Sequence, residues 1–193
     1  MTDLQRQAVD LVRSRGYERR EIPFKLASGE LSHDYVDGKF AVDTGERLLL
    51  VSRAVVELAE ANGIDFNAVG GLTMGADALA HGVSIASGCA WFAVRKEPKA
   101  RGREQWVEGG RLDTQSRVLL VDDVVSSGGS IQVAFKHVQD TGASVAGVIP
   151  MVDRGEHGGP WFAERGVPYF PLMTYHDLGI EPVGGSALSA ATR

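Results

Sequence analysis

The sequence predicts an α/β fold, with a Rossmann-like parallel sheet flanked by helices and a small N-terminal lobe. Short apolar runs without polar alternation are typical of strands that are buried on both faces of a parallel sheet. Stretches with helical spacing separate these runs, and such alternation is the pattern of a helix-covered parallel sheet. The expected strands cover 67–71, 90–94, 117–122, 144–152 and 168–173, with helices at 74–87, 130–140 and 160–166.

The first 43 residues are expected to form an opening helix and the small N-terminal lobe. Leu4, Ala8 and Leu11 share one helical stripe, and Gly16 follows as a stop signal. The stretch 21–45 is rich in turn-forming residues with short apolar pieces between them. This composition indicates either irregular structure or a small hairpin.

One domain is expected to take in all 193 residues, with its α/β core over about 44–175. Thr44 offers a hydroxyl N-cap for a helix over 47–63, which Gly63 ends. The parallel strands follow this helix. Ligands of such sheets gather at the carboxyl ends of the strands, so functional residues are expected there.

The composition is typical of a cytoplasmic protein without membrane or nucleic-acid partners. The net charge of −5 gives no general attraction to nucleic acid. No window approaches the roughly 20 apolar residues of a membrane helix, and the polar start MTDLQRQAVD lacks the apolar centre of a signal peptide. Affinity for an anion must therefore come from a local cluster of charges.

The segment 95–116 breaks the alternation, because it is too long for an ordinary connection between strands. Glycines 102, 109 and 110 offer hinges, and the first half is rich in cations: Arg95, Lys96, Lys99, Arg101 and Arg103. One interpretation is a solvated surface loop. The other is a mobile cationic lid over a polyanionic substrate, since long loops in compact domains often have this role.

The stretch VLLVDDVVSSGGS, residues 118–130, places two acids beside a loop suited to an anion. A helix begins just after SSGGS, so free backbone N–H groups, serine hydroxyls and the helix dipole converge there. Asp122 and Asp123 would repel a bound phosphate unless they bind another part of the ligand. A ribose 5-phosphate meets both demands, with its phosphate in the loop and its 2- and 3-hydroxyls on the carboxylates.

Other phosphate and metal sites fit the sequence less well. No GxGxxG opens a helix, and GGLTMGAD has Ala76 and Asp77 where a P-loop has a lysine and a hydroxyl residue. Receiver domains carry an LLVDD-like run that holds Mg²⁺, but they have a lysine further on, and Lys136 is the last lysine of this chain. The alternative without function is a strand that merely ends in two acids and a polar turn.

VLLVDDVVSSGGS resembles the binding motif for 5-phosphoribosyl 1-diphosphate (PRPP) of the type I phosphoribosyltransferases. That motif begins with a run of apolar residues and continues with two acids, two more apolar residues and a small Thr/Ser/Gly loop. This stretch has the same order. The resemblance implies the type I phosphoribosyltransferase fold and a Mg²⁺-dependent exchange in which a nitrogen base displaces pyrophosphate at the anomeric carbon. Its transition state is similar to an oxocarbenium ion, which nearby anions stabilise.

Four more stretches are similar to elements of the orotate phosphoribosyltransferases. LASGELSHDYVDGK at 26–39 resembles their Leu-x-Ser-Gly element, and VGGLTMGADALA at 69–80 takes the place of the pyrophosphate loop. RKEPKARG at 95–102 resembles the catalytic loop, and VDRGE at 152–156 resembles the Asp-Arg element whose arginine meets the carboxylate of the base. The resemblance implies a homodimer that shares the 95–116 loop across its interface. The activity that the resemblance implies is the formation of orotidine 5-monophosphate and pyrophosphate from orotate and PRPP, for UMP biosynthesis.

The resemblance also implies roles for individual residues. The catalytic residues would be Lys96, Lys99, Arg101, Asp122 and Asp123. PRPP would be bound by Lys39, Thr73, Met74, Gly75, Arg95, Lys96, Lys99, Asp122, Asp123, Val124, Val125, Ser126, Ser127, Gly128, Gly129 and Ser130. Orotate would be bound by Ser28, Tyr35, Ser126 and Arg154. Mg²⁺ would be held mainly by PRPP, near Asp77, without a side-chain ligand set of its own.

Three positions depart from the family's pattern. Many members have a histidine at the position of Arg101 and a lysine at that of Ala27, and some have a lysine at that of Gly75. These departures leave open a phosphoribosyltransferase for uracil or a purine, although neither base has a carboxylate to pair with Arg154. A PRPP-sensing regulator that binds nucleic acid is the alternative from another class, and the net acidity argues against it.

Overall fold

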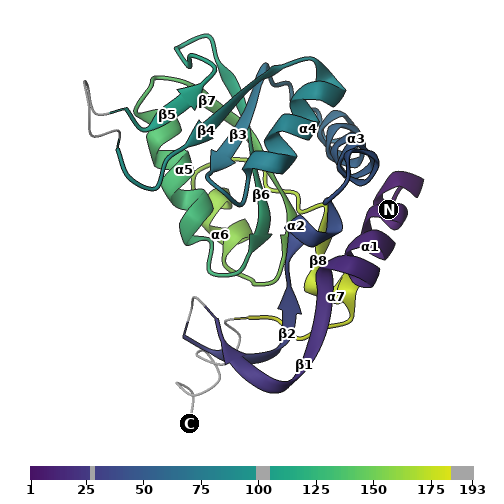
Figure 1. Cartoon of the computed structure of the whole chain (residues 1–193). Helices are drawn as coiled ribbons and strands as arrows, with labels where there is room; N and C mark the ends of the chain where they lie inside the picture. The colour runs from purple at the N-terminus through teal and green to yellow at the C-terminus, as the bar shows by residue number, and fades with distance from the viewer. Residues whose placement is uncertain (27–28, 99–104, 184–193) are drawn as a thin grey trace.

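The computed structural model describes residues 1–26, 29–98 and 105–183, which are built around one main sheet (Figure 1). Within these residues, six strands follow one another in the order β5-β4-β3-β6-β7-β8. Each neighbouring pair is parallel except β4 and β5, which are antiparallel. The strands are β3 Ala68–Leu72, β4 Ala90–Val94, β5 Val107–Gly109, β6 Arg117–Val125, β7 Ser144–Asp153 and β8 Met173–Thr174. The α/β class expected from the sequence is confirmed.

Helices cover both faces of this sheet (Figure 1). One face carries α1 (Asp3–Leu11), α3 (Gly45–Ala61) and α4 (Asp77–Ser87), and the other carries α5 (Gly129–Gln139) and α6 (Gly158–Ala163). β6 supplies both cores, since Leu119 and Val121 pack toward the first set of helices and Val118 and Leu120 toward the second. This two-sided burial explains the absence of polar alternation in β6. No helix in the described ranges combines the length and apolar character needed to cross a bilayer.

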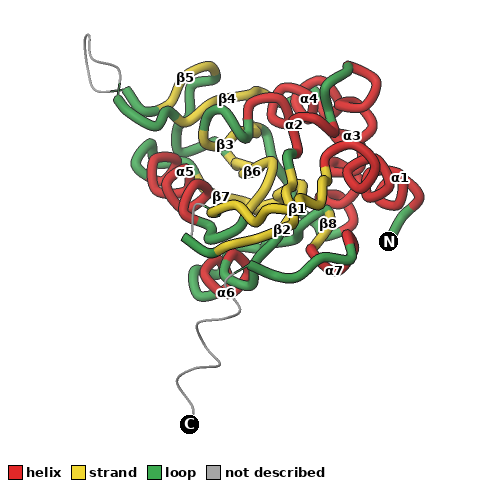
Figure 2. Tube along the Cα trace, turned by 60° about the horizontal axis from the view of Figure 1, so that its bottom comes forward, coloured by secondary structure: helices red, strands yellow, loops and turns green. Residues whose placement is uncertain are grey.

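The N-terminal lobe is an antiparallel hairpin of β1 (Tyr17–Lys25) and β2 (Leu31–Val36), which we call the hood. A π-helical turn, Val12–Gly16, leads from α1 into β1, and α2 (Gly38–Ala41) follows β2. Figures 1 and 2 show the hairpin outside the main sheet, with its two strands side by side. Of the two possibilities that the sequence left open for this lobe, the structure has the hairpin.

The last expected strand, 168–173, is shorter than predicted. It is reduced to a single bridge between Tyr169 and β7 and to the two-residue strand β8, which α7 (Tyr175–Leu178) follows. Phe170 and Leu172 donate to Val148 and Pro150 of β7, but Pro168 lacks the N–H group that would extend this pairing toward the start of the segment.

Two strands differ from the expected ones: β5 was not predicted, and β6 is longer than predicted. Val107–Gly109, within the expected 95–116 loop, forms the edge strand β5 and pairs with β4. β6 continues to Val125, past its expected end at residue 122, because Val124 and Val125 still pair with β7. Asp122 and Asp123 therefore lie within a strand, at a level where β7 still pairs with it and the pairing with β3 has ended.

Candidate active site

Polar and charged residues gather at the carboxyl edge of the sheet. In sheet order, β4, β3, β6 and β7 are followed directly by Arg95, Thr73, Ser126 and Arg154. Because parallel strands end at the same edge, residues from four sequence segments come together there. The hood reaches the same edge, since Arg154 donates to the carbonyl oxygen of Asp34 in β2 at 2.8 Å. The candidate site therefore lies between the sheet edge and the hood.

The loop between β6 and α5 forms a small anion cradle. Gly128 adopts φ 81° directly before α5, a left-handed conformation that suits glycine. The N–H groups of the first turn of α5 lack intrahelical acceptors and carry the positive end of the helix dipole. A cavity of about 110 Å³ lies here, lined by Asp122, Val124, Val125, Ser126, Ser127, Gly128, Gly129 and Ser130. Its size and its donors suit one phosphate group.

Asp122 and Asp123 place two neighbouring carboxyl groups beside this cradle. Asp122 is only 4% exposed, and its Oδ1 accepts the Asp123 N–H at 3.1 Å. Burial, together with the charge of Asp123, raises the pKa of Asp122 to about 7. Asp123 Oδ2 accepts from Lys39 Nζ at 2.8 Å, and Asp37 Oδ1 lies 3.2 Å from the same ammonium group. The two acids therefore differ, because Asp122 titrates near neutral pH and Asp123 is held by a lysine.

The loop after β3 lies directly against these acids. Thr73 Oγ1 donates to Asp77 Oδ2 at 2.6 Å, which joins the start of the loop to the first turn of α4. A Cβ atom at Gly75 would lie 2.7 Å from Oδ1 of both Asp122 and Asp123. This close approach gives a physical reason for glycine at a position where some orotate phosphoribosyltransferases have lysine.

A larger cavity lies where β3 and β4 end. Its volume is about 640 Å³, and it is lined by Thr73, Met74, Asp77, His81, Trp91, Ala93, Arg95, Lys96, Glu97 and Glu108. Two predicted cations, Arg95 and Lys96, thus share a cavity with the loop after β3. Arg95 is also paired with Glu108, with 3.4 Å between Nη1 and Oε1. The other predicted cations of this segment, Lys99 and Arg101, lie outside the described residues.

Arg154 is buried beneath the hood, with 2% of its surface exposed. Nη1 donates to the Asp34 carbonyl oxygen, Nη2 lies 3.5 Å from Ser32 Oγ, and Nε is buried without a hydrogen-bond partner among the described residues. Burial lowers the pKa of Arg154, and the charge of Asp34 acts in the opposite direction. The Nε donor of this guanidinium group is therefore left without an acceptor in the described part of the chain, and it is shielded from the surface.

Tyr35 lies on the opposite face of β2 from the one that contacts Arg154. Its ring packs edge-on against Phe24, with centroids 5.4 Å apart, and its hydroxyl donates to Asp37 Oδ2 at 3.3 Å. Successive side chains of a strand point to opposite faces, so the structure does not bring Tyr35 and Arg154 together. Ser28, another predicted base contact, lies outside the described residues.

Known proteins share both the sequence and the fold of this chain. The family model of the phosphoribosyl transferase domain matches residues 42–167. The orotate phosphoribosyltransferase of Aquifex aeolicus is 36% identical over 176 residues, which cover 87% of this chain and 93% of that protein. That of Rhodopirellula baltica is 36% identical over 183 residues, which cover 90% of this chain and 93% of that protein.

This chain belongs to the orotate phosphoribosyltransferases.

The crystal structure of the Mycobacterium tuberculosis H37Rv orotate phosphoribosyltransferase in complex with PRPP agrees with this membership. It is 31% identical, has a TM-score of 0.76, and the match covers 92% of this chain and 99% of that one. The family and the fold that the resemblance implied are thus confirmed. The roles of individual residues in this orotate phosphoribosyltransferase remain predictions.

The structure brings together most of the residues that the sequence assigned to PRPP. The acid pair, the cradle, Lys39 and the loop after β3 meet at one edge of the sheet. Sequence reasoning missed Ser32 and Asp34, which contact Arg154, and Asp37, which is the second carboxylate at Lys39. The alternation of Ser32 and Asp34 along β2 was the available signal, because residues two apart in a strand share a face.

Proposed function

We propose that this chain transfers the 5-phosphoribosyl group of PRPP to orotate, with release of pyrophosphate, and so forms orotidine 5-monophosphate for UMP biosynthesis. The observation that carries the proposal is the position of Asp122 and Asp123 directly beside the anion cradle at 126–130. This arrangement offers a ribose phosphate both an anion site and hydroxyl acceptors. The orotate and PRPP named for the relatives support the choice of substrates.

In this proposal the ribose lies between the cradle and the acids. The N–H groups at the start of α5 bind the 5-phosphate, and the serine hydroxyls of the loop add donors. Asp122 and Asp123 accept hydrogen bonds from the 2- and 3-hydroxyls. As the bond to pyrophosphate lengthens, the anomeric carbon gains positive charge, which the nearby carboxylates stabilise. Lys39, which contacts Asp123, brings a cation to the same place.

Gly75→Ala is expected to raise the KM for PRPP about tenfold, because the added Cβ displaces both carboxylates from the ribose site. The KM for orotate should change little. Gly45→Ala is the matched control, since a Cβ at Gly45 meets no atom within 4 Å. Steady-state kinetics with PRPP as the varied substrate measure both variants. An unchanged KM for Gly75→Ala would show that the added Cβ does not displace the acids during turnover.

Mg²⁺ is the proposed cofactor, held mainly by the phosphates of PRPP. Within the described residues, no group of three or more acidic, histidine or cysteine side chains could hold an ion. Mg²⁺ often binds through one or two carboxylates together with substrate phosphates, and this site fits that arrangement. Asp77 Oδ1 is the candidate ligand, because it is buried without a hydrogen-bond partner in the described part of the chain. When bound, Mg²⁺ supplies positive charge to the leaving pyrophosphate.

Arg95 and Lys96 are proposed to neutralise the pyrophosphate as it leaves. Both line the cavity beside the loop after β3, where the diphosphate end of PRPP lies in this proposal. Lys99 and Arg101 follow them in the sequence and have the same predicted role. Because several cations share this work, the departure at Arg101 is tolerable.

Orotate is proposed to lie beneath the hood, next to Arg154. A cavity of about 870 Å³ opens there, lined by Arg19, Leu26, Glu30, Leu31, Ser32, His33, Asp34, Glu181, Pro182 and Val183. Ser32 and Asp34 of this lining also contact Arg154. The guanidinium group of Arg154, whose Nε lacks an acceptor among the described residues, suits the carboxylate that distinguishes orotate from uracil and the purines. Contacts of the base with Ser28, Tyr35 and Ser126 stay predictions.

A homodimer that shares the 95–116 loop is also proposed. Met74, Ile85 and Trp91 expose 68%, 76% and 40% of their surface. Met74 and Trp91 line the cavity that contains Arg95, so these apolar side chains lie next to the start of the loop. Exposed apolar side chains that cluster in this way suit coverage by a second copy of the chain. A cytoplasmic location stays a prediction from composition.

The affinity for PRPP is expected to rise with pH through about 7. The pKa of Asp122 is raised to about 7 by burial and by Asp123. This carboxyl group is therefore mostly ionised, and able to accept a hydrogen bond from a ribose hydroxyl as a carboxylate, only above that pH. A raised folded-state pKa stabilises the free protein at low pH, and this contribution is lost as the pH rises from about 4 to about 7. PRPP reverses the preference, because it binds the ionised form and releases a proton.

Calorimetric titration with PRPP at about pH 6 and about pH 8 measures this dependence. Asp122→Asn is the control, because PRPP itself also titrates in this range. The variant should lose the part of the pH dependence that belongs to the carboxyl. The same dependence in both proteins would exclude Asp122 as its source.

The reaction itself is tested by offering orotate, uracil, hypoxanthine and adenine separately to the purified protein with PRPP and Mg²⁺. Orotate alone should be consumed, with one pyrophosphate released for each base. Consumption of another base with orotate untouched would favour the phosphoribosyltransferase for uracil or a purine. Binding of PRPP without consumption of any base would favour the regulator.

A further inference from the structure

Trp106 lies at the base of the connection that carries Arg95 and Lys96. The Arg95 N–H donates to the Trp106 carbonyl oxygen at 2.8 Å, which joins the two sides of the connection just after β4. Val107, the next residue, pairs with Val94 where β5 lies against β4. The backbone of Trp106 is therefore fixed to the residue that is proposed to meet the pyrophosphate.

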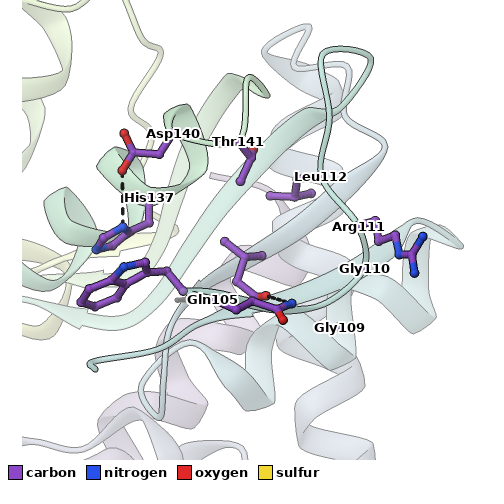
Figure 3. A pocket seen from close by; sticks show the side chains of 10 residues that line it. Gln105, Gly109, Gly110, Arg111, Leu112, His137, Asp140 and Thr141 are labelled. Atoms are coloured by element: carbon purple, nitrogen blue, oxygen red, sulfur yellow. Dashed lines mark hydrogen bonds and ion pairs between the residues drawn. The ribbon is translucent and has the colours of Figure 1, made fainter. Parts of the chain in front are cut away.

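The ring of Trp106 contacts a different element. It is stacked on the ring of His137, with centroids 4.0 Å apart and planes inclined by 12°. His137 lies in the last turn of α5, its side chain is 12% exposed, and its Nδ1 is 3.5 Å from Asp140 Oδ2 (Figure 3). The first turn of the same helix forms the anion cradle. Trp106 thus joins the pyrophosphate side of the site to the helix of the 5-phosphate.

A cavity of about 400 Å³ lies beside this stack. Its lining includes Gly109 at the end of β5, Gly110, Arg111 and Leu112 after it, and Asp140 and Thr141 after α5 (Figure 3). Val107 and Leu112 pack on the core of the sheet, so the edge strand has support of its own. The stack therefore adds a link to α5 that the fold of the edge strand does not require.

We propose that Trp106 and His137 are positioning residues for PRPP. Their stack holds the base of the 95–106 connection at a fixed distance from α5, and so sets the spacing between Arg95 and the 5-phosphate cradle. This inference rests on the proposed function, in which the two phosphate ends of PRPP occupy these two places. A ligand with charges at both ends needs that spacing, because a displacement of about 1 Å at one end removes the reacting geometry at the other.

Three variants test the stack. Trp106→Leu and His137→Ala are each expected to lower kcat/KM for PRPP roughly 10- to 100-fold, with the KM for orotate within about twofold of its original value. His137→Phe keeps a flat ring against the indole and should restore most of the activity that His137→Ala loses. Thermal unfolding should show that all three proteins remain folded, since the stack lies at the C-terminal end of α5.

Trp161→Leu is the matched control. Trp161 also packs on α5, against Phe135 with ring centroids 5.4 Å apart, but it lies on α6 rather than at the base of the connection. Its removal should lower the melting temperature and leave the PRPP kinetics unchanged. Equal losses in Trp161→Leu and Trp106→Leu would mean that support of α5, rather than the spacing, explains the effect, and would overturn the proposal.

Binding of PRPP without base, measured by titration calorimetry, separates this inference from the proposed function. If the original protein consumes orotate and His137→Ala has unchanged kcat/KM for PRPP, the inference fails and the function stands. If the original protein binds PRPP but consumes no orotate, the function fails. The dissociation constants of Trp106→Leu and His137→Ala for PRPP then decide the inference, with weaker binding expected and equal binding contradicting it.

Discussion

Asp123→Asn lowers kcat/KM for PRPP roughly 100- to 1000-fold, as expected for the loss of a charged group that acts on the transition state. The amide keeps the shape of the side chain but removes the negative charge that accepts from a ribose hydroxyl and faces the developing positive charge. It also removes one of the two carboxylates at Lys39, whose Nζ lies 2.8 Å from Asp123 Oδ2 and 3.2 Å from Asp37 Oδ1. Steady-state kinetics with PRPP as the varied substrate measure the change.

Asp65→Asn is the control for this variant. The Asp65 side chain is 80% exposed and pairs with Arg117 at 3.1 Å. Arg117 is the first residue of β6, whereas Asp122 and Asp123 lie near the end of that strand. Its loss should leave the kinetics unchanged. A fully active Asp123→Asn protein would remove the carboxylate from hydroxyl binding, and a melting temperature below that of the control would point to damage of the fold instead.

Lys96→Ala lowers kcat about 100-fold and leaves the KM for orotate within about twofold, because the ammonium acts on the leaving pyrophosphate rather than on the base. Lys96 lines the cavity at the ends of β3 and β4 together with Arg95. Lys99→Ala, at a position outside the described residues, is expected to behave in the same way.

Lys136→Ala is the matched control for both lysine variants, since Lys136 is an exposed lysine in the last turn of α5. Single-turnover measurements separate the chemical step from product release. A Lys96→Ala protein with an unchanged chemical step would remove this lysine from the departure of pyrophosphate.

The end of β6 could be predicted from the sequence because its signals are local. Asp122 and Asp123 adjoin the small residues of the cradle in the chain, and a helix start follows directly. Strand, loop and helix start each have a pattern that can be read within a few residues. The structure places Asp122 and the cradle around one small cavity, with Asp123 beside Asp122 in the same strand.

Contacts between distant segments could not be predicted in this way. The bond from Arg154 to Asp34 depends on where the hood lies, and the stack of Trp106 on His137 depends on how the edge strand returns to the sheet. β5 has three residues, too few for a period of their own, so its pairing is set by β4. The close approach of Gly75 to the two acids likewise comes from the packing of the loop after β3 against the end of β6.

A crystal structure of this protein with PRPP and Mg²⁺ tests the two-ended ribose phosphate site most directly. The 5-phosphate should lie against the N–H groups at 126–130, with the 2- and 3-hydroxyl oxygens about 2.5 to 3.0 Å from the carboxylates of Asp122 and Asp123. The distance of 2.8 Å between Lys39 Nζ and Asp123 Oδ2 should differ in that complex. A phosphate bound elsewhere, with neither carboxylate within hydrogen-bond distance of a sugar hydroxyl, would contradict the site.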